Sequence, residues 1–326
     1  MKIKWFKKIF SDGNHNAFTG LAFFEGKYYL CFRNGTGHAS NESFQIIMTS
    51  SDGEKWNILQ KNLMKNLESI TVDYRDSYFL PLKDKLFLYS CCTPVDNDGK
   101  RGKSYTQLQT ISRSSQCVHE PQTVCRDIVL WKPIKVENTF YAAGYGKDHS
   151  GNYEIDFYVS EDGLNWEKQS HISEGSETVL YSSGKDSLTA FVRTEASPYH
   201  LKIFQSNKPF EKWIQISEIP QIIQGFHIIE TGNKVYLIGR ERPDYMETAD
   251  KNNPSLSRHR TKIWLFENNG LAEVLELPSL GDNAYPGTAL MPDGTLLISY
   301  YSQHECGGGE WRKEMPADIF LAAVEI

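Results

Sequence analysis

Residues 21–32, LAFFEGKYYLCF, decide the fold class of this chain. Two apolar runs flank the polar pair Glu25-Gly26, and this pattern predicts a β-hairpin, because such residues form tight turns between strands. Five similar segments follow, at residues 78–89, 134–143, 179–192, 226–238 and 289–300. A supersecondary unit that recurs about every 50 residues indicates a propeller or another repeat architecture.

Two further strand-like runs follow most of these hairpins and complete four-stranded blades. In the first blade they are residues 44–50 (FQIIMTS) and 56–60 (WNILQ); the less regular second blade has 104–112 and 122–131 (QTVCRDIVLW). The last hairpin is followed only by residues 318–326 (DIFLAAVEI), and the N-terminal run 3–10 (IKWFKKIF) is available as its missing outer strand. The sequence therefore predicts an all-β, six-bladed β-propeller of four-stranded antiparallel blades. We expect a single domain over residues 1–326, with the last blade closed by the N-terminal strand.

Charge and composition exclude several classes of partner. The net charge of the 326-residue chain is −6 at pH 7, which disfavours nucleic acid. No apolar run approaches the ~18 residues that a membrane-spanning helix needs, and residues 1–10 lack the apolar core of a signal peptide. We therefore expect a cytoplasmic protein that binds neither nucleic acid nor a membrane. No histidine or cysteine spacing typical of a metal site occurs, so no metal and no other cofactor is expected.

Two short turns of the pattern DGxxW support the blade assignment. Residues 51–56 (SDGEKW) and 161–166 (EDGLNW) occupy the same place in the first and third blades, between the third and fourth strands, and residues 206–213 are a degraded copy. In such a turn Asp caps backbone amides, Gly takes a positive φ and Trp packs beneath the turn. We expect these turns to be structural and to lie on the face opposite the functional site.

The polar residues collect at one end of the predicted propeller, because loops that precede the first strand and follow the second lie at the same end of each blade. Five arginines are expected there: Arg33, Arg75, Arg193, Arg240 and Arg242. The same loops carry His15, His38, His227, His304, Tyr285 and Tyr301. Clustered guanidinium groups bind carboxylate, phosphate or sulfate. We predict that at least three of the arginines line one cavity and that the ligand is a small anionic molecule.

Three residues at this end are candidates for catalysis, and each also has a structural interpretation. Glu177 and Arg193 belong to the same hairpin, so they form an ion pair or Arg193 keeps a catalytic base ionised. Tyr285 is a packing residue or a nucleophile. Asp76 is the salt-bridge partner of Arg75 or a general acid.

These motifs resemble the bacterial sialidase-like propellers with BNR repeats. The resemblance rests on residues 15–18, residues 31–35 with His38, and residues 73–76, and it continues through 176–178, 192–195 and 281–287 to cover nearly the whole chain. The DGxxW turns resemble the Asp-box of that family, shortened by one residue.

In that family three arginines hold the substrate carboxylate, a Tyr assisted by a Glu is the nucleophile, and an Asp is the acid. The resemblance assigns Glu177, Arg193, Arg240 and Tyr285 to four of these roles. His15-Asn16 stands where the first arginine is expected, and the acid Asp is missing. His38 or Asn41 lies nearest to it, and Arg75 with Asp76 is a possible substitute for the missing pair.

The leading hypothesis is an exo-glycosidase that acts on a carboxylate-bearing sugar such as a nonulosonic acid. Its catalytic residues are Glu177, Tyr285, Asp76 and His38, and its substrate-binding residues are Arg33, Arg75, Arg193, Arg240, His15, His227 and Tyr301. One alternative is a non-catalytic propeller that binds acidic glycans. Another is a two-carboxylate glycoside hydrolase that uses Glu177 with Asp76 or Glu195. In that case a separation of about 5–5.5 Å between the carboxyl groups indicates retention and about 6.5–9.5 Å indicates inversion.

Overall fold

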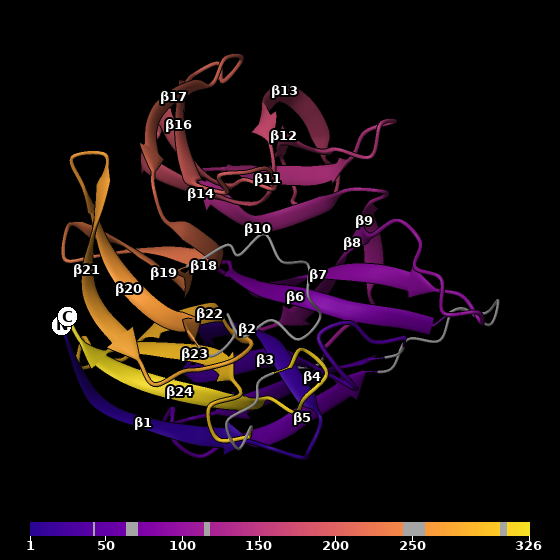
Figure 1. The fold of residues 1–326 in the computed structure, drawn as a ribbon, viewed down its shortest axis with the longest axis vertical. Coiled ribbons are helices and arrows are strands. Elements are labelled where there is room, and N and C mark those ends of the chain that lie inside the picture. The colour runs from indigo at the N-terminus through magenta and orange to yellow at the C-terminus, as the bar shows by residue number, and fades with distance from the viewer. Residues whose placement is uncertain (42, 63–70, 114–117, 244–257, 307–311) are drawn as a thin grey trace.

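The structure, a computed structural model, is a six-bladed β-propeller in which every blade has four antiparallel strands. It describes residues 1–41, 43–62, 71–113, 118–243, 258–306 and 312–326. The blades surround a common axis, and the first strand of each lies innermost (Figure 1). Within these residues there is no helix that is long and apolar enough to cross a membrane. The predicted fold class is confirmed.

The first three blades follow one another along the chain. Blade 1 consists of β2 (His15–Phe24), β3 (Lys27–Gly35), β4 (Ser43–Ser50) and β5 (Asn57–Asn62). Blade 2 consists of β6 (Thr71–Pro81), β7 (Lys85–Val95), β8 (Tyr105–Ser112) and β9 (Gln122–Cys125). Blade 3 consists of β10 (Val129–Val136), β11 (Thr139–Lys147), β12 (Tyr153–Ser160) and β13 (Glu167–Glu174).

The last three blades continue in the same order, and the sixth takes its outer strand from the N-terminus. Blade 4 consists of β14 (Ser176–Gly184), β15 (Ser187–Arg193), β16 (Leu201–Asn207) and β17 (Ile214–Ile219). Blade 5 consists of β18 (Ile222–Thr231), β19 (Lys234–Arg242), β20 (Arg260–Glu267) and β21 (Gly270–Leu277). Blade 6 consists of β22 (Asn283–Leu290), β23 (Leu296–Ser302), β24 (Asp318–Glu325) and β1 (Lys2–Phe10).

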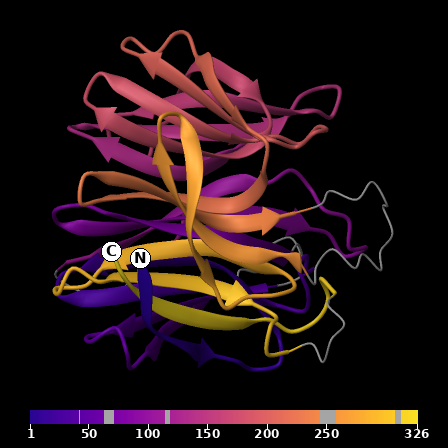
Figure 2. The same cartoon turned by 60° about the vertical axis from the view of Figure 1, so that its left-hand side comes forward.

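The ring closes through the pairing of β1 with β24, as the sequence predicts. The register runs antiparallel from Lys2 opposite Glu325 to Phe10 opposite Ile319. The two ends of the chain consequently lie side by side in both ribbon views (Figures 1 and 2). The prediction for residues 122–131 is partly wrong, because this run is two strands rather than one. Asp127 has a positive φ of 62° and separates β9 from β10, which is already the inner strand of blade 3.

The DGxxW turns have the structure that their residues predict. The Asp162 carboxylate accepts hydrogen bonds from the backbone N–H groups of Leu164 and Asn165, both at 2.8 Å. The Trp166 indole donates to the carbonyl of Gly163 at 3.1 Å, and the turn that contains Asp52 repeats both features. In the degraded copy, the Trp213 indole donates instead to the Ser170 hydroxyl.

Every inner strand carries a β-bulge at the same level. In blade 1, Ala17 pairs with Arg33 and Gly20 with Cys31, so Phe18 and Thr19 together oppose one residue of β3. The same shift recurs in the other five blades. We call the first residue of the six bulges the bulge ring: Phe18, Asp76, Lys132, Glu177, Gly225 and Tyr285. All of them except Glu177 have a positive φ, between 43° and 59°.

A positive φ costs a residue with a side chain roughly 1–2 kcal/mol. Four blades nevertheless have a non-glycine residue with a positive φ at this level, which indicates that the bulge conformation has a function. Bulges redirect side chains and are common beside functional sites. Here five of the six bulge residues carry a side chain at this level, and blade 5 has Gly225.

Candidate active site

The Glu177 carboxylate joins three blades at the bulge ring. Its Oε1 accepts a hydrogen bond from the Tyr285 hydroxyl at 2.7 Å and forms an ion pair with Arg193 Nη1 at 2.6 Å. Its Oε2 accepts the backbone N–H of Gly225 at 3.1 Å. Arg193 Nη1 is also 3.3 Å from the Tyr285 hydroxyl. One carboxylate, one phenol and one guanidinium group therefore share a single buried cluster.

The environment assigns opposite protonation states to Glu177 and Tyr285. Burial favours the neutral form of Glu177, but the charge and hydrogen bond of Arg193 outweigh it and hold the pKa of the carboxyl below its usual value. Burial, reinforced by the charge of Glu177, raises the pKa of Tyr285 well above the ordinary value. The phenol is thus neutral, and its hydroxyl donates a hydrogen bond to the ionised carboxylate of Glu177. This is the arrangement of a nucleophile with an adjacent base.

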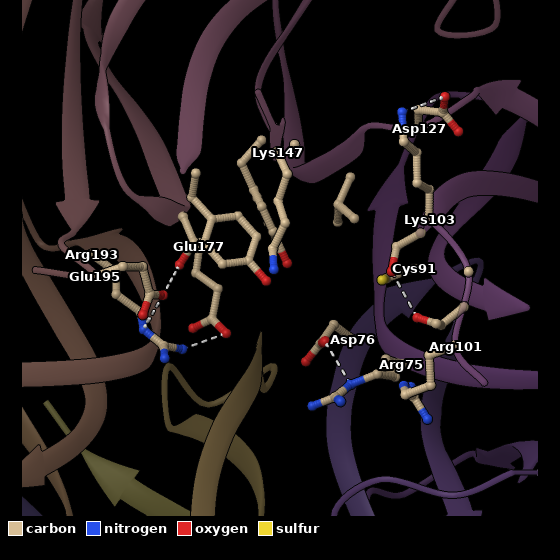
Figure 3. A pocket seen from close by; sticks show the side chains of 18 residues that line it. Arg75, Asp76, Cys91, Arg101, Lys103, Asp127, Lys147, Glu177, Arg193 and Glu195 are labelled. Carbon is tan, nitrogen blue, oxygen red and sulfur yellow. Dashed lines mark hydrogen bonds and ion pairs between the residues drawn. The ribbon is translucent and has the colours of Figure 1, made fainter. Parts of the chain in front are cut away.

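A cavity of about 680 Å³ lies against this cluster, and its walls come from blades 2, 3 and 4 (Figure 3). Five cationic side chains line it: Arg75, Arg101, Lys103, Lys147 and Arg193. Four acidic side chains do so as well: Asp76, Asp127, Glu177 and Glu195. Tyr285 is buried and reaches this wall through its hydrogen bond to Glu177.

Asp76 stands across the cavity from Glu177 and differs from it in protonation (Figure 3). Burial raises the pKa of Asp76 to about 7; Arg75 opposes this shift and the charge of Glu177 adds to it. The nearest ion pair, Arg75 Nε to Asp76 Oδ2, is long at 3.8 Å. Two carboxyl groups whose pKa values are moved in opposite directions are the usual basis of an acid and base pair.

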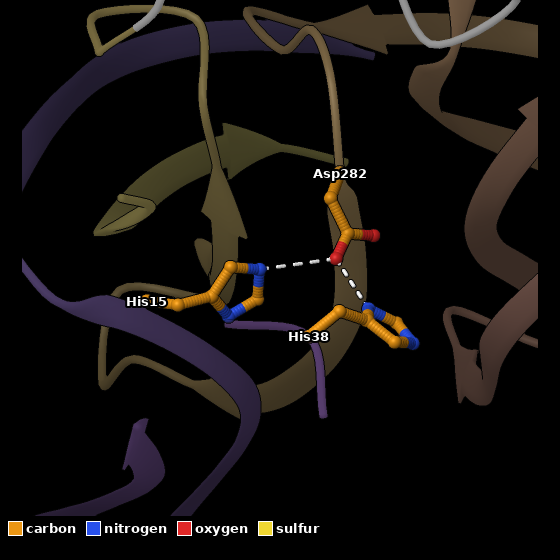
Figure 4. Close-up of side chains that lie close together, drawn as sticks. All are labelled: His15, His38 and Asp282. Atoms are coloured by element: carbon orange, nitrogen blue, oxygen red, sulfur yellow. Dashed lines mark hydrogen bonds and ion pairs between the residues drawn. The ribbon is translucent and has the colours of Figure 1, made fainter. Parts of the chain in front are cut away.

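A second buried cluster surrounds Asp282, which directly precedes β22 (Figure 4). Its Oδ1 accepts hydrogen bonds from Arg240 Nη1 at 2.7 Å and from the Tyr301 hydroxyl at 2.9 Å. Its Oδ2 contacts His15 Nε2 at 3.1 Å and also His38 Nδ1. The donors hold the pKa of Asp282 well below its usual value despite complete burial.

The protonation state of His38 follows from the same cluster. Burial lowers the pKa of His38 to about 3 even though Asp282 opposes the shift. A neutral His38 donates from Nδ1 to Asp282 and accepts at Nε2 from Arg75 Nη2, 3.3 Å away. His38 therefore bridges Arg75 and Asp282. Because it is neutral at neutral pH, Asp76 is the better candidate for the general acid.

The Asp282 cluster has the composition of a metal site, since one ligand atom from each of His15, His38 and Asp282 lies within 4.8 Å of the others. The guanidinium groups of Arg240 and Arg75 adjoin the same three side chains. Two fixed positive charges disfavour a cation there. Hydrogen bonds between the three side chains already account for their convergence.

The structure brings part of the predicted site together. Glu177, Tyr285, Asp76, Arg75 and Arg193 surround the cavity or contact a residue that lines it. Of the five predicted arginines, only Arg75 and Arg193 line this cavity, which is fewer than the three expected; Arg101, which was not predicted, lines it as well. Arg101 escaped prediction because β7 runs to Val95, beyond the expected end at Tyr89, and carries the following loop to the same end of the blade.

The other predicted ligand-binding residues lie elsewhere, in ion pairs or hydrogen bonds with other residues. Arg33 is buried and binds Asp73 through Nε at 2.8 Å, as Arg101 does through Nη2 at 2.7 Å. His15, Arg240 and Tyr301 hold Asp282, as described above. His227 is buried with its Nε2 3.1 Å from the Thr288 hydroxyl. A direct contact of these residues with substrate stays a prediction.

The comparisons with known proteins agree with the fold. No family model matches the sequence, and no curated protein matches it. A protein of unknown function from Dyadobacter fermentans DSM 18053 superposes with a TM-score of 0.76 at 17% identity, over 100% of this chain and 99% of that one. Trypanosoma rangeli sialidase in complex with sialic acid gives a TM-score of 0.69 at 13% identity. The fold is sialidase-like.

This chain spans about half of that sialidase, because the superposition covers 96% of this chain and 55% of the other. A phage phi92 endosialidase gives a TM-score of 0.67 at 11% identity, with coverage of 98% and 69%. At these identities the likeness extends to the fold alone.

Proposed function

We propose that this protein is a glycoside hydrolase of the sialidase-like, Asp-box type that removes an acidic sugar, with Tyr285 as nucleophile and Glu177 as its base. The observation that carries the proposal is the hydrogen bond of 2.7 Å from the Tyr285 hydroxyl to Glu177, beside Arg193. A phenol with a raised pKa attacks an anomeric carbon only when a base removes its proton. Glu177 is ionised and already in hydrogen-bonding contact, so no rearrangement is needed for that step.

The reaction has two steps. In the first, Glu177 takes the phenolic proton, Tyr285 Oη bonds to the anomeric carbon, and the glycosidic C–O bond breaks. Asp76, with a pKa near 7, gives its proton to the leaving oxygen. In the second step a water molecule attacks the same carbon and loses a proton to Asp76, while Tyr285 departs and recovers its proton from Glu177. Each group ends in the state in which it began.

The acidic substrate follows from the charges on the cavity wall. Five cations face four acidic groups, of which Asp76 is partly protonated near pH 7. Arg75 and Arg101 both line the blade 2 side of the cavity (Figure 3) and can present guanidinium groups to a carboxylate. The sialic acid bound by the Trypanosoma rangeli protein of the same fold is a sugar of this class.

A second candidate, a two-carboxylate glycoside hydrolase, is favoured by one observation. Asp76 and Glu177 both line the cavity, whereas Tyr285 is buried, with 4% of its surface exposed. In that mechanism Asp76 is the acid, Glu177 acts on the anomeric carbon or on water, and Tyr285 only orients Glu177.

Turnover of a panel of acidic-sugar aryl glycosides tests these proposals. We expect Glu177→Gln to lower kcat by about 10²–10⁴-fold with binding of the acidic sugar largely retained. Asp127→Asn is the matched control, with turnover expected to stay unchanged, because Asp127 also lines the cavity but pairs with Lys103 and has no role in either mechanism. Unchanged turnover in Glu177→Gln would contradict the role of Glu177 as the base.

The two mechanisms are separated by Tyr285→Phe and by a fluorinated substrate that traps a covalent intermediate. Loss of turnover in Tyr285→Phe, together with a sugar adduct on the peptide that contains Tyr285, supports the tyrosine mechanism. Retained turnover, or an adduct on Glu177, supports the two-carboxylate mechanism. Stable binding without product from any substrate would favour a non-catalytic glycan-binding propeller.

A further inference from the structure

Lys132 is the one basic member of the bulge ring, and its side chain crosses the propeller axis. It belongs to blade 3 and is buried, with 9% of its surface exposed. Its Nζ donates to the backbone carbonyl of Phe226 at 3.0 Å and to that of Pro286 at 3.3 Å. Those carbonyls belong to the bulges of blades 5 and 6. One ammonium group therefore links three bulges.

The two carbonyls are adjacent in sequence to the partners of Glu177. Phe226 follows Gly225, whose N–H donates to Glu177 Oε2. Pro286 follows Tyr285, whose hydroxyl donates to Glu177 Oε1. Any displacement of either carbonyl moves a donor that holds the Glu177 carboxylate.

The charge of Lys132 also acts on the two carboxyl groups of the cavity, Asp76 and Glu177. Asp76 on β6 and Glu177 on β14 both favour its ammonium form, against a burial that lowers the pKa of Lys132 to about 7. In return, the charge of Lys132 lowers the pKa of Asp76. His227 on β18 faces the same charge and is kept neutral by burial, with Lys132 adding to that effect.

We infer that Lys132 is a positioning residue: its ammonium group fixes Tyr285 and Gly225 around Glu177 and places a positive charge near Asp76. Its ammonium group ties the carbonyls of blades 5 and 6 to blade 3, so the distance between nucleophile and base does not depend on packing alone. The inference about Asp76 concerns the free protein; the inference about turnover rests on the proposed function.

The first test needs no substrate. In protein labelled with ¹³C at the aspartate carboxyl, the resonance that disappears in Asp76→Asn identifies Asp76, and its pH titration is followed in wild type and in Lys132→Met. Removal of a nearby positive charge raises the pKa of a carboxyl by about one unit or more. We expect that shift in Lys132→Met, a much smaller one in Lys132→Arg, and none in Lys135→Met, whose lysine is exposed on the same strand. The same Asp76 midpoint in Lys132→Met and wild type would overturn the inference.

The second test measures the reaction. Because substrate contacts stay intact, we expect Lys132→Met to lower kcat by about 10²-fold, as a misplacement of about 1 Å does, while KM stays within about threefold. The alkaline limb of the pH profile should move upward by the same amount as the Asp76 titration. If Lys132→Met does not fold, Lys132→Gln replaces it, and Lys132→Arg decides whether the charge matters. A loss of kcat in Lys132→Arg equal to that in Lys132→Met contradicts the role of the charge. A proposed function that fails leaves the titration result untouched.

Discussion

Gly225 is the position where the geometry of the site makes its sharpest prediction. A Cβ atom at Gly225 would lie 2.4 Å from both Cδ2 and Cε2 of Tyr285, and 2.8 Å from its Cγ. Carbon atoms in contact are separated by about 3.5–4.0 Å, so the overlap exceeds 1 Å. The Tyr285 ring cannot simply retreat, because the rings of Phe18, Trp131 and Tyr301 surround it with centroids 4.9 to 6.2 Å away.

We expect Gly225→Ala to lower the free energy of unfolding by about 3–5 kcal/mol. Alanine at the positive φ of 54° contributes about 1 kcal/mol, and overpacking contributes about 1–3 kcal/mol. Displacement of the ring also weakens the hydrogen bond of Tyr285 to the charged Glu177, which is worth about 1.5–3 kcal/mol when intact. Part of these costs overlaps, because one movement of the ring relieves the clash and lengthens the bond.

Gly232→Ala is the matched control. Gly232 has nearly the same φ, 59°, and a Cβ atom there would meet nothing within 4 Å. Its cost is therefore the backbone contribution alone, about 1 kcal/mol. Urea unfolding of both variants, with unchanged m-values, measures the difference. Values for the two variants that agree within about 0.5 kcal/mol would refute the reasoning that Gly225 exists to admit the Tyr285 ring.

Two further predictions concern Asp282 and the Asp-box turn. Asp282→Ala leaves the Arg240 guanidinium without its carboxylate, so it should cost about 3–5 kcal/mol in the free energy of unfolding, and formate should restore part of the melting temperature. Asp282→Asn should not respond to formate, and an equal response of both variants would contradict an anion site there. Asp162→Ala, in the Asp-box turn, should lower the free energy of unfolding by about 1 kcal/mol, as the loss of a cap does. Because the N–H groups of Asn165 and Leu164 hold the pKa of Asp162 below its unfolded value, this stabilisation is present above pH ~4 and is lost on acidification. Urea unfolding at pH 6 and pH 2 should therefore show the gap between wild type and Asp162→Ala closing.

The sequence carries most of the information on the fold because its signals are local. A hairpin turn such as Glu25-Gly26 is read from adjacent residues, and six of them fix the number of blades. The closing strand is predicted because the last blade lacks one strand and the strand-like run at residues 3–10 belongs to no other blade. The end of a strand is harder to read: β7 continues through Cys91-Cys92 to Val95, and this extension brings Arg101 to the cavity.

The contact of Tyr285 with Glu177 was indicated only by the family resemblance. Residue spacing alone could predict a contact only where two partners share a hairpin. Glu177 and Arg193 do so, and their ion pair is the part of the site that spacing could indicate. Arg240 and Asp282 are 42 residues apart, and no local pattern distinguishes an arginine that awaits a ligand from one that already has a buried carboxylate. The sequence places Lys132 at the polar end of blade 3 but gives no signal of its role, because its partners are backbone carbonyls of distant blades.

The pairing of β1 with β24 has a consequence for the synthesis of the chain on the ribosome. β1 emerges before its partner strand β24, which follows roughly 300 residues later, and at about 5–20 residues per second this is a wait of about 15–60 s. Throughout that time its backbone groups have no neighbour, and an unpaired strand is a template for association with other chains. Lys2, Lys4, Lys7 and Lys8 give this strand a dense positive charge. Charge of that kind discourages pairing between nascent copies on one messenger until the native partner arrives.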